Sequence, residues 1–460
     1  MPFIAKYYKG QTAGVIGLGK SGQAVAKLLL KNGFKVLGSD SRPAKELKST
    51  LSKGFPRTFR WEGSGHSEKL LKCGFIVKSP GLPPHLPIFQ KLREAHIPVY
   101  SELEIALAFS KCREIVAITG TNGKTTTTAL TAEIFKGARR GKVYACGNIG
   151  LAISEVAPKA RSKDTLVVEA SSYQLEDSTS FRPQAAALLN ITADHLDHHG
   201  SMDAYIEAKA RVFNEQQDPE ACVFNAADPL AFKLSRRARG KKLFFGPPEH
   251  GRTHAWVAGG KIKMQLPGQK KEVALVPPDL PGRHNLENAM AAALLAASRG
   301  IKPAQIQKAF KKFRGVEHRL EDIGAVRGIR CINDSKATNV DSTMVALEAL
   351  ASENAKPPRV LLILGGLHKG SPYTPLRGLI ERCVKGILTI GSAARKVDED
   401  LGGLVPILPC VNLETAVQTA FQIGDKGDLL LLSPACASFD QFKNFEERGR
   451  RFKELVRAQK

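Results

Sequence analysis

The sequence predicts an α/β protein that contains several domains, each built on a mainly parallel sheet. Apolar segments of about five residues alternate with amphipathic stretches of about ten or more, which is the pattern of parallel strands joined by crossover helices. Glycine-rich turns follow two of the apolar segments and open helices. The chain has 460 residues, about two to three times the usual domain size, so two to four domains are expected.

The first domain is expected over residues 1–105. A Pro-rich stretch, SPGLPPHLP at 79–87, and a helix capped by Ser101 mark its end and lead into the second domain. The elements expected at its start are a strand over 13–17, a helix over about 21–31 and a strand over 34–39 that ends in Asp40.

The second domain is expected over 106–315 and the third over 316–460. The strands expected in the second domain cover 114–118, 165–168 and 185–190, and an alanine-rich helix after Asn285 closes it. The strands expected in the third domain cover 330–333, 359–364, 386–390 and 428–432.

Composition restricts the class of protein. The 68 Lys+Arg and 44 Asp+Glu give a net charge of +24, large enough to attract polyanions. The positive residues are scattered in ones and twos, so nucleic-acid binding is not expected as the main function. The eight cysteines contain no C-x-x-C pair and are expected to be apolar core residues. A signal peptide and a membrane-spanning apolar run are not found, which predicts a cytoplasmic protein without a transmembrane segment.

The first glycine-rich turn is GLGKSG at 17–22, with Asp40 about twenty residues further on. Backbone N–H groups and a helix N-terminus in such a turn can approach a pyrophosphate. Three interpretations stay open at this point: a nicotinamide dinucleotide, another nucleotide, or a tight turn without a ligand.

The second glycine-rich loop is TGTNGKTT at 119–126, between an apolar strand and a helix. Its backbone amides and Lys124 are expected to bind ATP phosphates, and the Thr125 hydroxyl to coordinate Mg²⁺. Ile118 stands where the usual P-loop has its first glycine, so the loop is a shorter variant. The residues expected to bind ATP here are Gly120, Thr121, Asn122, Gly123, Lys124, Thr125 and Thr126.

Carboxylates and imidazoles follow two later strands of the second domain. Glu169 lies just past the strand over 165–168, where it could bind a metal ion at the carboxyl edge of a parallel sheet. His195 belongs to NITADHLDHH at 190–199, which could hold a second divalent ion or form a polar loop. Because the chain has no zinc-binding pattern such as H-E-x-x-H, Mg²⁺ or Mn²⁺ is favoured.

Three segments of the third domain place hydroxyls and lysines at strand ends. They are NDSKATN at 333–339, GGLHKG at 365–370 and SPACASFDQFK at 433–443. Each could be a solvent-facing loop, but three of them at one sheet edge suggest recognition of carboxylates.

These residues together resemble the Mur ligase family of peptidoglycan synthesis, over nearly the whole chain. The last two motifs of the following set favour the D-glutamate-adding members. The motifs are GTNGKTT at 120–126, CGNIG at 146–150, EASSYQLE at 169–176, NITADHLDHH at 190–199, PGRHNLENA at 281–289, EHR at 317–319, NDSKATN at 333–339 and SPACASFDQFKNFEERG at 433–449.

The resemblance implies an N-terminal Rossmann-like domain for a UDP moiety, a central P-loop ATPase-like domain and a C-terminal Rossmann-like α/β domain that helps bind the amino acid. It implies an enzyme that uses ATP and two Mg²⁺ ions to join D-glutamate to UDP-N-acetylmuramoyl-L-alanine through an acyl phosphate. We expect a monomer with these small-molecule substrates and no nucleic-acid partner.

The resemblance also implies roles for individual residues. The metal and catalytic set is Lys124, Thr125, Glu169, His195 and Lys209, the last a lysine that is commonly carbamylated. The further nucleotide residues are Asn285, Asn288, Arg319 and Asp334. The UDP-substrate residues are Gly17, Leu18, Gly19, Lys20, Ser21, Asp40, Ser41, Arg42 and Asn148. The D-glutamate residues are Lys336, Thr338, Lys369, Ser438 and Phe445.

Two other classes of protein stay open. A sibling or folylpolyglutamate-type ligase would add a different amino acid, and the folylpolyglutamate type should lack the GLGKSG unit. A nucleic-acid-stimulated ATPase would explain the charge, but 7% aromatics and the lack of a recognisable binding motif give it little support.

Overall fold

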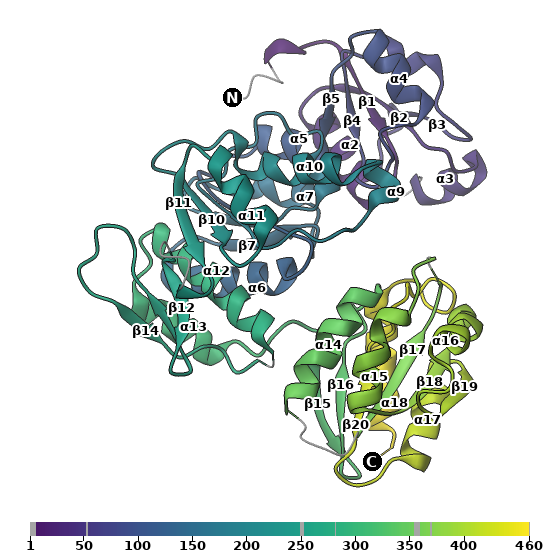
Figure 1. The fold of residues 1–460 in the computed structure, drawn as a ribbon. Helices are drawn as coiled ribbons and strands as arrows, with labels where there is room; N and C mark the ends of the chain where they lie inside the picture. Colours follow the sequence, from purple (N-terminus) through teal and green to yellow (C-terminus); the bar gives the residue numbers. More distant parts are fainter. Residues whose placement is uncertain are drawn as a thin grey trace. The chain divides into compact units, whose positions relative to one another are not determined.

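The computed structural model describes residues 6–51, 54–248, 253–280, 282–353, 359–368 and 370–459. Within these residues the strands form three sheets that follow one another along the chain (Figure 1). The chain divides into two compact units, of which the first (Met1–Pro278 and Leu286–Phe313) contains the first two sheets and the second (Asp279–Asn285 and Arg314–Lys460) the third. The predicted α/β class is confirmed, whereas the boundaries at 105 and 315 stay predictions.

The first sheet is parallel, in the order β3-β2-β1-β4-β5. Buried β1 side chains such as Val15 face α2, α3 and α5, and Ile16 faces the opposite side with α4. This alternation is that of a strand with both faces covered. The elements are β1 (Thr12–Ile16), α2 (Lys20–Lys31), β2 (Lys35–Ser39), α3 (Ala44–Leu51), β3 (Arg60–Glu62), β4 (Phe75–Lys78), α4 (Pro87–Glu94), β5 (Val99–Ser101) and α5 (Glu102–Ala108).

The central sheet has the order β14-β13-β12-β11-β10-β9-β6-β8-β7, with β6 to β11 parallel. Its elements up to the end of the parallel part are β6 (Glu114–Thr119), α6 (Lys124–Ala138), β7 (Val143–Gly147), α7 (Ile153–Val156), β8 (Thr165–Glu169), α8 (Ser172–Leu175), β9 (Ala185–Leu188), α9 (Leu196–His199), α10 (Met202–Asn214), β10 (Ala221–Asn225), α11 (Pro229–Leu234) and β11 (Lys241–Phe245). Two helices, α12 (Arg283–Ser298) and α13 (Pro303–Lys312), follow, and α13 packs on α6.

An antiparallel extension of the central sheet was not predicted from the sequence. It consists of β12 (Ala255–Ala258), which is parallel to β11, and of β13 (Lys261–Met264) and β14 (Val273–Leu275), which continue antiparallel. Gly259 and Gly260, both with positive φ (56° and 69°), form the two-residue turn between β12 and β13. A Gly-Gly pair between short apolar segments is a hairpin signal, so the sequence did contain this information.

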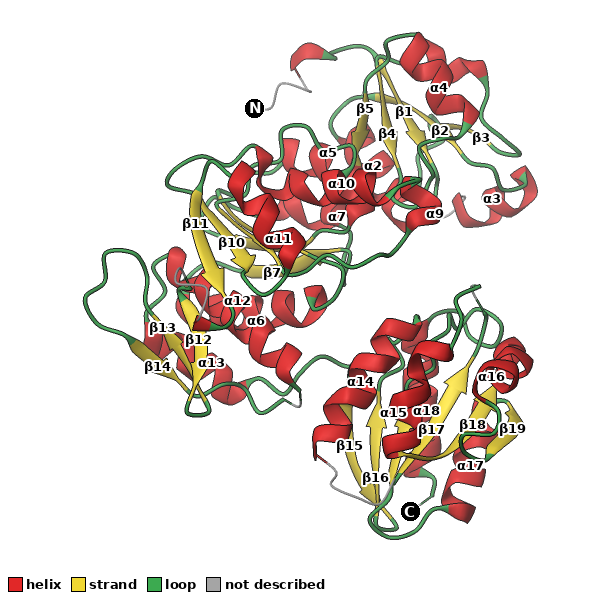
Figure 2. Ribbon diagram, in the orientation of Figure 1, coloured by secondary structure: helices red, strands yellow, loops and turns green. Residues whose placement is uncertain are grey.

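The third sheet has the order β15-β16-β20-β17-β18-β19, parallel except for the edge strand β15. Figure 2 shows these strands with helices packed around them. The elements are β15 (Glu321–Val326), β16 (Ile329–Asn333), α14 (Val340–Glu353), β17 (Val360–Gly365), α15 (Arg377–Cys383), β18 (Val384–Ile390), α16 (Ala394–Leu401), β19 (Ile407–Val411), α17 (Leu413–Ile423), β20 (Leu429–Leu432) and α18 (Phe445–Arg457).

The central strands of the third sheet are buried on both faces. In β17, Leu362 and Leu364 belong to a core with α14, α15 and α16, while Leu361 and Ile363 belong to a core with α17 and α18. A continuous apolar run is therefore required here. This topology brings the ends of β16, β17 and β20 to one edge, so the three polar segments at 333–339, 365–370 and 433–443 begin side by side, as expected.

Candidate active site

The phosphate loop connects β6 to α6. Gly123 lies at the N-cap of α6 with φ 83°, a conformation that glycine adopts without strain. A Cβ at this position would lie 2.3 Å from Oδ1 of Asn288, which also accepts a hydrogen bond from the Thr127 hydroxyl at 3.2 Å. The structure therefore places Asn288, predicted as a nucleotide residue, beside the phosphate loop. Thr125 and Thr126 are buried in the first turn of α6.

Two lysines converge on the carbonyl oxygen of Gly120. Lys124 Nζ donates to it at 2.8 Å and to the Thr121 carbonyl at 2.7 Å, and Lys209 Nζ, on α10, donates to it at 2.7 Å. Lys209 is 1% exposed. Burial, together with the positive charge of Lys124, lowers the pKa of Lys209 well below its ordinary value. Its amine therefore loses its proton more readily than that of a surface lysine.

The segment that follows β9 holds the loop in shape. Asn190 Oδ1 accepts from the Asn122 N–H at 2.8 Å, and its amide donates to the Asn122 carbonyl at 3.2 Å. The Thr121 hydroxyl donates to the Thr192 carbonyl at 3.1 Å and accepts from the Thr192 N–H at 3.0 Å. Sequence reasoning assigned no role to Asn190 or Thr192.

Glu169 is the last residue of β8 rather than the first residue after it, and it is 1% exposed. Its Oε1 accepts a hydrogen bond from the Asn148 amide at 2.9 Å. Its Oε2 is buried without a hydrogen-bond partner in the described part of the chain. A buried carboxylate oxygen that is left without a donor is costly, and a bound cation would satisfy it.

His195 precedes α9 in the left-handed region, with φ 55°. Its ring lies 4.9 Å from that of Tyr173, and its side chain is 46% exposed. Burial of the ring, opposed by Asp194 and reinforced by Lys124 and Lys209, lowers the pKa of His195 below 6.5. A neutral imidazole is the form that binds a metal ion. The structure thus brings His195 into the electrostatic environment of the two lysines.

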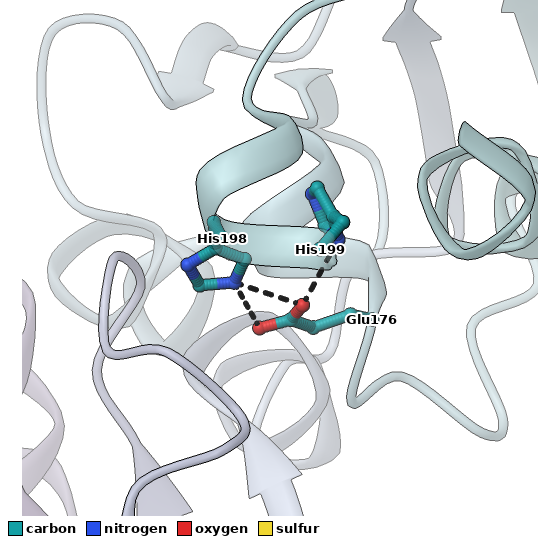
Figure 3. A group of neighbouring side chains, drawn as sticks. All are labelled: Glu176, His198 and His199. Carbon is teal, nitrogen blue, oxygen red and sulfur yellow. Dashed lines mark hydrogen bonds and ion pairs between the residues drawn. The ribbon is translucent and has the colours of Figure 1, made fainter. Parts of the chain in front are cut away.

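The other two histidines of the motif form a polar cluster with Glu176 (Figure 3). His198 Nε2 lies 3.0 Å from both carboxylate oxygens of Glu176, and His199 Nδ1 lies 3.5 Å from one of them. Lys78, at the end of β4, forms buried ion pairs with Glu176 and with Asp177, the latter at 2.7 Å. Because an ammonium group already contacts Glu176, this cluster is an ion-pair network rather than a second cation site.

The GLGKSG turn is held by Asp40. The Leu18 N–H donates to Asp40 Oδ2 at 2.7 Å, and Arg42 donates through its backbone and side chain at 2.9–3.0 Å. Burial opposes ionisation, but these hydrogen bonds outweigh it and lower the pKa of Asp40 to about 2. Gly22 must be glycine, because a Cβ there would lie 1.7 Å from the Gly17 carbonyl oxygen.

Other predicted UDP-substrate residues lie around this turn. Lys20 Nζ donates to the carbonyl of Gly150, in the CGNIG loop, at 2.9 Å, while Ser41 is exposed. Ser21 is half-buried in the first turn of α2. Glu102, at the start of α5, is buried, which raises its pKa, and its Oε1 accepts from the Ser154 N–H of the central domain at 3.0 Å. The turn is thus connected to the central domain, in which Asn148 contacts Glu169.

In the second unit, the predicted nucleotide residues lie next to the third sheet. Asp334 is buried, and it accepts from the Ser433 hydroxyl at 2.8 Å and the Leu320 N–H at 3.1 Å. Burial, partly offset by these bonds, raises its pKa to about 6. Arg319 lies between His318 and Leu320, both with positive φ (65° and 42°). Its charge adds to the effect of burial, which lowers the pKa of His284 to about 4. His284 is the neighbour of Asn285.

The predicted D-glutamate residues are partly brought together. Lys336 Nζ lies 5.6 Å from the ring centre of Phe445, a cation–π contact. Thr338 is half-buried and Ser438 is 2% exposed, each in one of the three loops at the same sheet edge. Lys369 lies outside the described residues.

Comparison with known proteins decides the family. Three Mur ligase domains match in order: the MurD-like N-terminal domain at residues 11–101, the middle domain at 118–296 and the glutamate ligase domain at 318–436. A UDP-N-acetylmuramoylalanine--D-glutamate ligase from Elusimicrobium minutum is 45% identical, over 99% of this chain and 100% of its own. One of the same name from Koribacter versatilis is 41% identical, over 98% of both chains.

The chain belongs to the Mur ligase family. Its fold agrees with that of a solved family member, the UDP-N-acetylmuramate-alanine ligase MurC from Thermotoga maritima, with a TM-score of 0.60 at 21% identity over 98% of this chain and 100% of that one. The predicted family, three-domain α/β fold and ligase class are confirmed. In the described part of this Mur ligase, none of the helices has the length and apolar character needed to cross a bilayer.

Several residues that shape the Mur ligase site were missed by sequence reasoning. Asn190 lies within a motif quoted for the resemblance, and an amide that follows a strand could have suggested a loop-stabilising role. Lys78 pairs with a residue 98 positions away, for which no local signal exists. Tyr205 was missed for the same reason. Its hydroxyl lies 2.9 Å from that of Thr121, and its ring centre lies 4.5 Å from Lys209 Nζ.

Proposed function

We propose that this Mur ligase joins D-glutamate to UDP-N-acetylmuramoyl-L-alanine with cleavage of ATP to ADP and phosphate. The full-length identity of 45% to a ligase of that name carries the choice of substrates. The arrangement of Lys124, Lys209 and Glu169 supports the ATP-dependent step, because two lysine amino groups converge on the phosphate loop and a buried carboxylate ends the neighbouring strand β8.

The reaction follows from this chemistry. A terminal carboxylate oxygen of the UDP-linked substrate attacks the γ-phosphorus of ATP, and ADP leaves. The D-glutamate amine then attacks the carbonyl of the acyl phosphate, phosphate leaves with the C–O electron pair, and the amine loses a proton. Negative charge accumulates on the transferring group and then on the tetrahedral oxygen, so Lys124 and the loop amides stabilise both stages. A nucleophilic side chain is not required.

The site fits Mg²⁺ in its donor set. Glu169 Oε2 is a buried oxygen without a hydrogen-bond donor among the described residues, and Thr125 supplies a hydroxyl at the start of α6. We assign Thr125, Glu169, His195 and Lys209 to two Mg²⁺ sites, in which Mn²⁺ could substitute. When bound, the ions neutralise phosphate charge. His195, with its lowered pKa, presents a neutral nitrogen near neutral pH.

Lys209 is suited to carbamylation. Its lowered pKa favours the neutral amine, which can add to CO₂ with loss of one proton and become an anionic oxygen ligand. Enzyme equilibrated with ¹³C-bicarbonate should show a carbamate carbon resonance that is absent from Lys209→Met. An identical spectrum for both proteins would contradict this assignment.

The remaining assignments belong to the same proposal. The GLGKSG turn, with Asp40 and Arg42, binds the uridine diphosphate, and Arg319, Asp334, Asn285 and Asn288 support the nucleotide. Lys336, Thr338, Lys369, Ser438 and Phe445 bind the two carboxylates of D-glutamate and leave its amine free. The enzyme acts as a monomer in the cytoplasm. Its three domains meet near residues 105 and 315 of the sequence.

The decisive experiment measures phosphate release from ATP and Mg²⁺ in the presence of UDP-N-acetylmuramoyl-L-alanine. D-glutamate, L-glutamate, L-lysine or no amino acid is added in parallel. Release that requires both the UDP substrate and D-glutamate is expected. A preference for another amino acid would keep the family and change the substrate, and no release in any mixture would refute the proposal.

A further inference from the structure

Arg448 is the largest fully buried side chain in the described part of the chain. It lies in the first turns of α18 and is 1% exposed. Long charged residues are almost never fully buried unless they are paired with an opposite charge. None of the described carboxylates lies within ion-pair distance of its guanidinium group, so its position needs another explanation.

The guanidinium group donates to two of the three loops at the carboxyl edge of the third sheet. In the loop after β16, Nε donates to the Ser335 hydroxyl at 3.0 Å and Nη2 to the Ser335 carbonyl at 2.8 Å. In the loop after β20, Nη2 donates to the Cys436 carbonyl at 3.1 Å and Nη1 to the Ala437 carbonyl at 3.5 Å. The planar fork of arginine allows one side chain to connect both loops.

The third loop is in contact with the same group. The Leu367 N–H donates to the Ala437 carbonyl at 2.9 Å, so the loop after β17 bonds to an acceptor of Arg448. A Cβ at Gly366 would lie 2.5 Å from the Ala437 carbonyl oxygen, which excludes a larger residue, and 3.2 Å from Nη1 of Arg448. The hydroxyl of Ser335 in turn donates to the carbonyl of Phe445 at 2.8 Å.

The charge of this group remains. Burial lowers the pKa of Arg448 to about 10, which still leaves it protonated at neutral pH. The hydrogen-bond partners of this buried cation are neutral carbonyls and a hydroxyl, and the nearest charges of opposite sign, Asp334 and Asp440, act on it only from beyond ion-pair distance. Its positive potential is therefore only partly offset. Such a potential at the base of the loops favours an anionic ligand. The attraction is stronger for a ligand with two carboxylates than for one with a single carboxylate.

We propose that Arg448 is the positioning residue of the amino-acid site: it holds the three loops in one arrangement and supplies a fixed positive charge beneath them. This inference rests on the proposed function, because it takes the loops to bind the dicarboxylate D-glutamate. Arg448 acts through Lys336, Thr338 and Ser438, which are the groups that contact the substrate.

The test compares steady-state constants of Arg448→Lys and Arg448→Met with those of the unmodified enzyme. Arg448→Lys keeps the charge but loses the fork, and its KM for D-glutamate should rise about tenfold. Arg448→Met loses both, and its KM should rise about a hundredfold. For each variant, the KM for the UDP-linked substrate, assigned to the first unit, should stay within about twofold because Arg448 touches none of its proposed residues.

Arg451 offers a matched control on the same helix. It forms exposed ion pairs with Glu414 and Glu454, so Arg451→Lys and Arg451→Met should leave every constant unchanged. If Arg448→Met does not fold, Ser335→Ala provides a gentler test, because it removes one acceptor of Arg448 without removing the charge. Ser335→Ala should raise the KM for D-glutamate about threefold. Its effect should not add to that of Arg448→Lys, because both remove the same bond.

The outcomes separate this inference from the function itself. Unmodified enzyme that releases phosphate without need of D-glutamate would contradict the function. D-glutamate-dependent enzyme in which folded Arg448→Lys and Ser335→Ala keep the original KM would overturn the role of Arg448 alone. An equal rise of the KM values for ATP, the UDP-linked substrate and D-glutamate would assign Arg448 to general stability. That result would likewise overturn its role in the amino-acid site.

Discussion

Lys78 is expected to hold the first two domains together through a buried ion pair. It is 3% exposed and forms ion pairs with Glu176 and Asp177, which lie beside the histidine motif of the central domain. Burial raises the pKa of Asp177 even in the presence of Lys78, so this carboxylate depends strongly on the ammonium group. Removal of Lys78 would leave two largely buried carboxylates, of which Glu176 keeps His198 and His199 as partners and Asp177 keeps only the more distant charge of Arg211 among the described residues.

The substitution Lys78→Met tests this with a side chain of similar length. Breaking a buried pair by removal of one partner costs about 3–5 kcal/mol, because an uncompensated charge stays behind. The expected result is a thermal unfolding transition that begins about 3–5 °C lower, for a chain of this size. Differential scanning calorimetry at pH 7.5 measures it, and limited proteolysis near the segment 171–180 should show earlier cleavage.

Lys91→Met is the matched control. Lys91 also pairs with a glutamate, Glu68, but both side chains are exposed, by 51% and 74%. Exposed pairs contribute little, so the transition should not move measurably. Equal shifts for Lys78→Met and Lys91→Met, or no shift for Lys78→Met, would refute the argument from burial.

The remaining predictions concern the candidate site and its supports. Asn190→Ala removes both hydrogen bonds to Asn122, so the KM for ATP should rise about tenfold in the phosphate-release assay while the fold is retained. Glu169→Gln replaces the unpartnered oxygen by an amide, and we expect loss of turnover together with a higher Mg²⁺ requirement in an activity titration. Gly22→Ala forces a Cβ into the Gly17 carbonyl, and calorimetric titration should show loss of UDP-substrate binding. Asp40, whose pKa is about 2, contributes about 2 kcal/mol of stability above its ordinary pKa near 4. The stability advantage over Asp40→Asn should therefore be constant above about pH 4 and shrink as the pH falls toward 2 in urea unfolding.

Strand and helix positions were largely predictable because they depend on local pattern. Leu361 to Leu364 form an unbroken apolar run, and the structure buries them alternately on two faces of the third sheet. Ser101 was expected to cap a helix, and its hydroxyl accepts from the Glu104 N–H at 3.2 Å. The hairpin at Gly259 and Gly260 was missed although its turn residues are present, because the short strands around it have little apolar periodicity.

The candidate site was predictable in residue type but not in arrangement. Lys124 follows from the spacing of the phosphate loop, and Glu169 from its place at a strand end. Lys209 meets Lys124 at the carbonyl of Gly120, a residue 89 positions before Lys209, and sequence pattern alone does not encode this contact. The same limit applies to Asp40: the turn motif identifies it, but only the structure shows that Arg42 and Leu18 occupy its oxygens.

The buried lysine and arginine side chains among the described residues, Lys78, Lys209 and Arg448, are of two kinds, which have different physical explanations. Lys78 has two carboxylate partners, and replacement of such a network by apolar side chains of similar volume is often tolerated. Lys209 and Arg448, in contrast, donate to carbonyl or hydroxyl oxygens, and among the described residues a carboxylate does not lie within ion-pair distance of either. Stability alone gives little reason to bury a basic group that has no carboxylate within ion-pair distance. An anionic substrate, or for Lys209 a carbamate that removes the positive charge altogether, does give such a reason, and each lies where the proposed reaction handles phosphate or carboxylate groups.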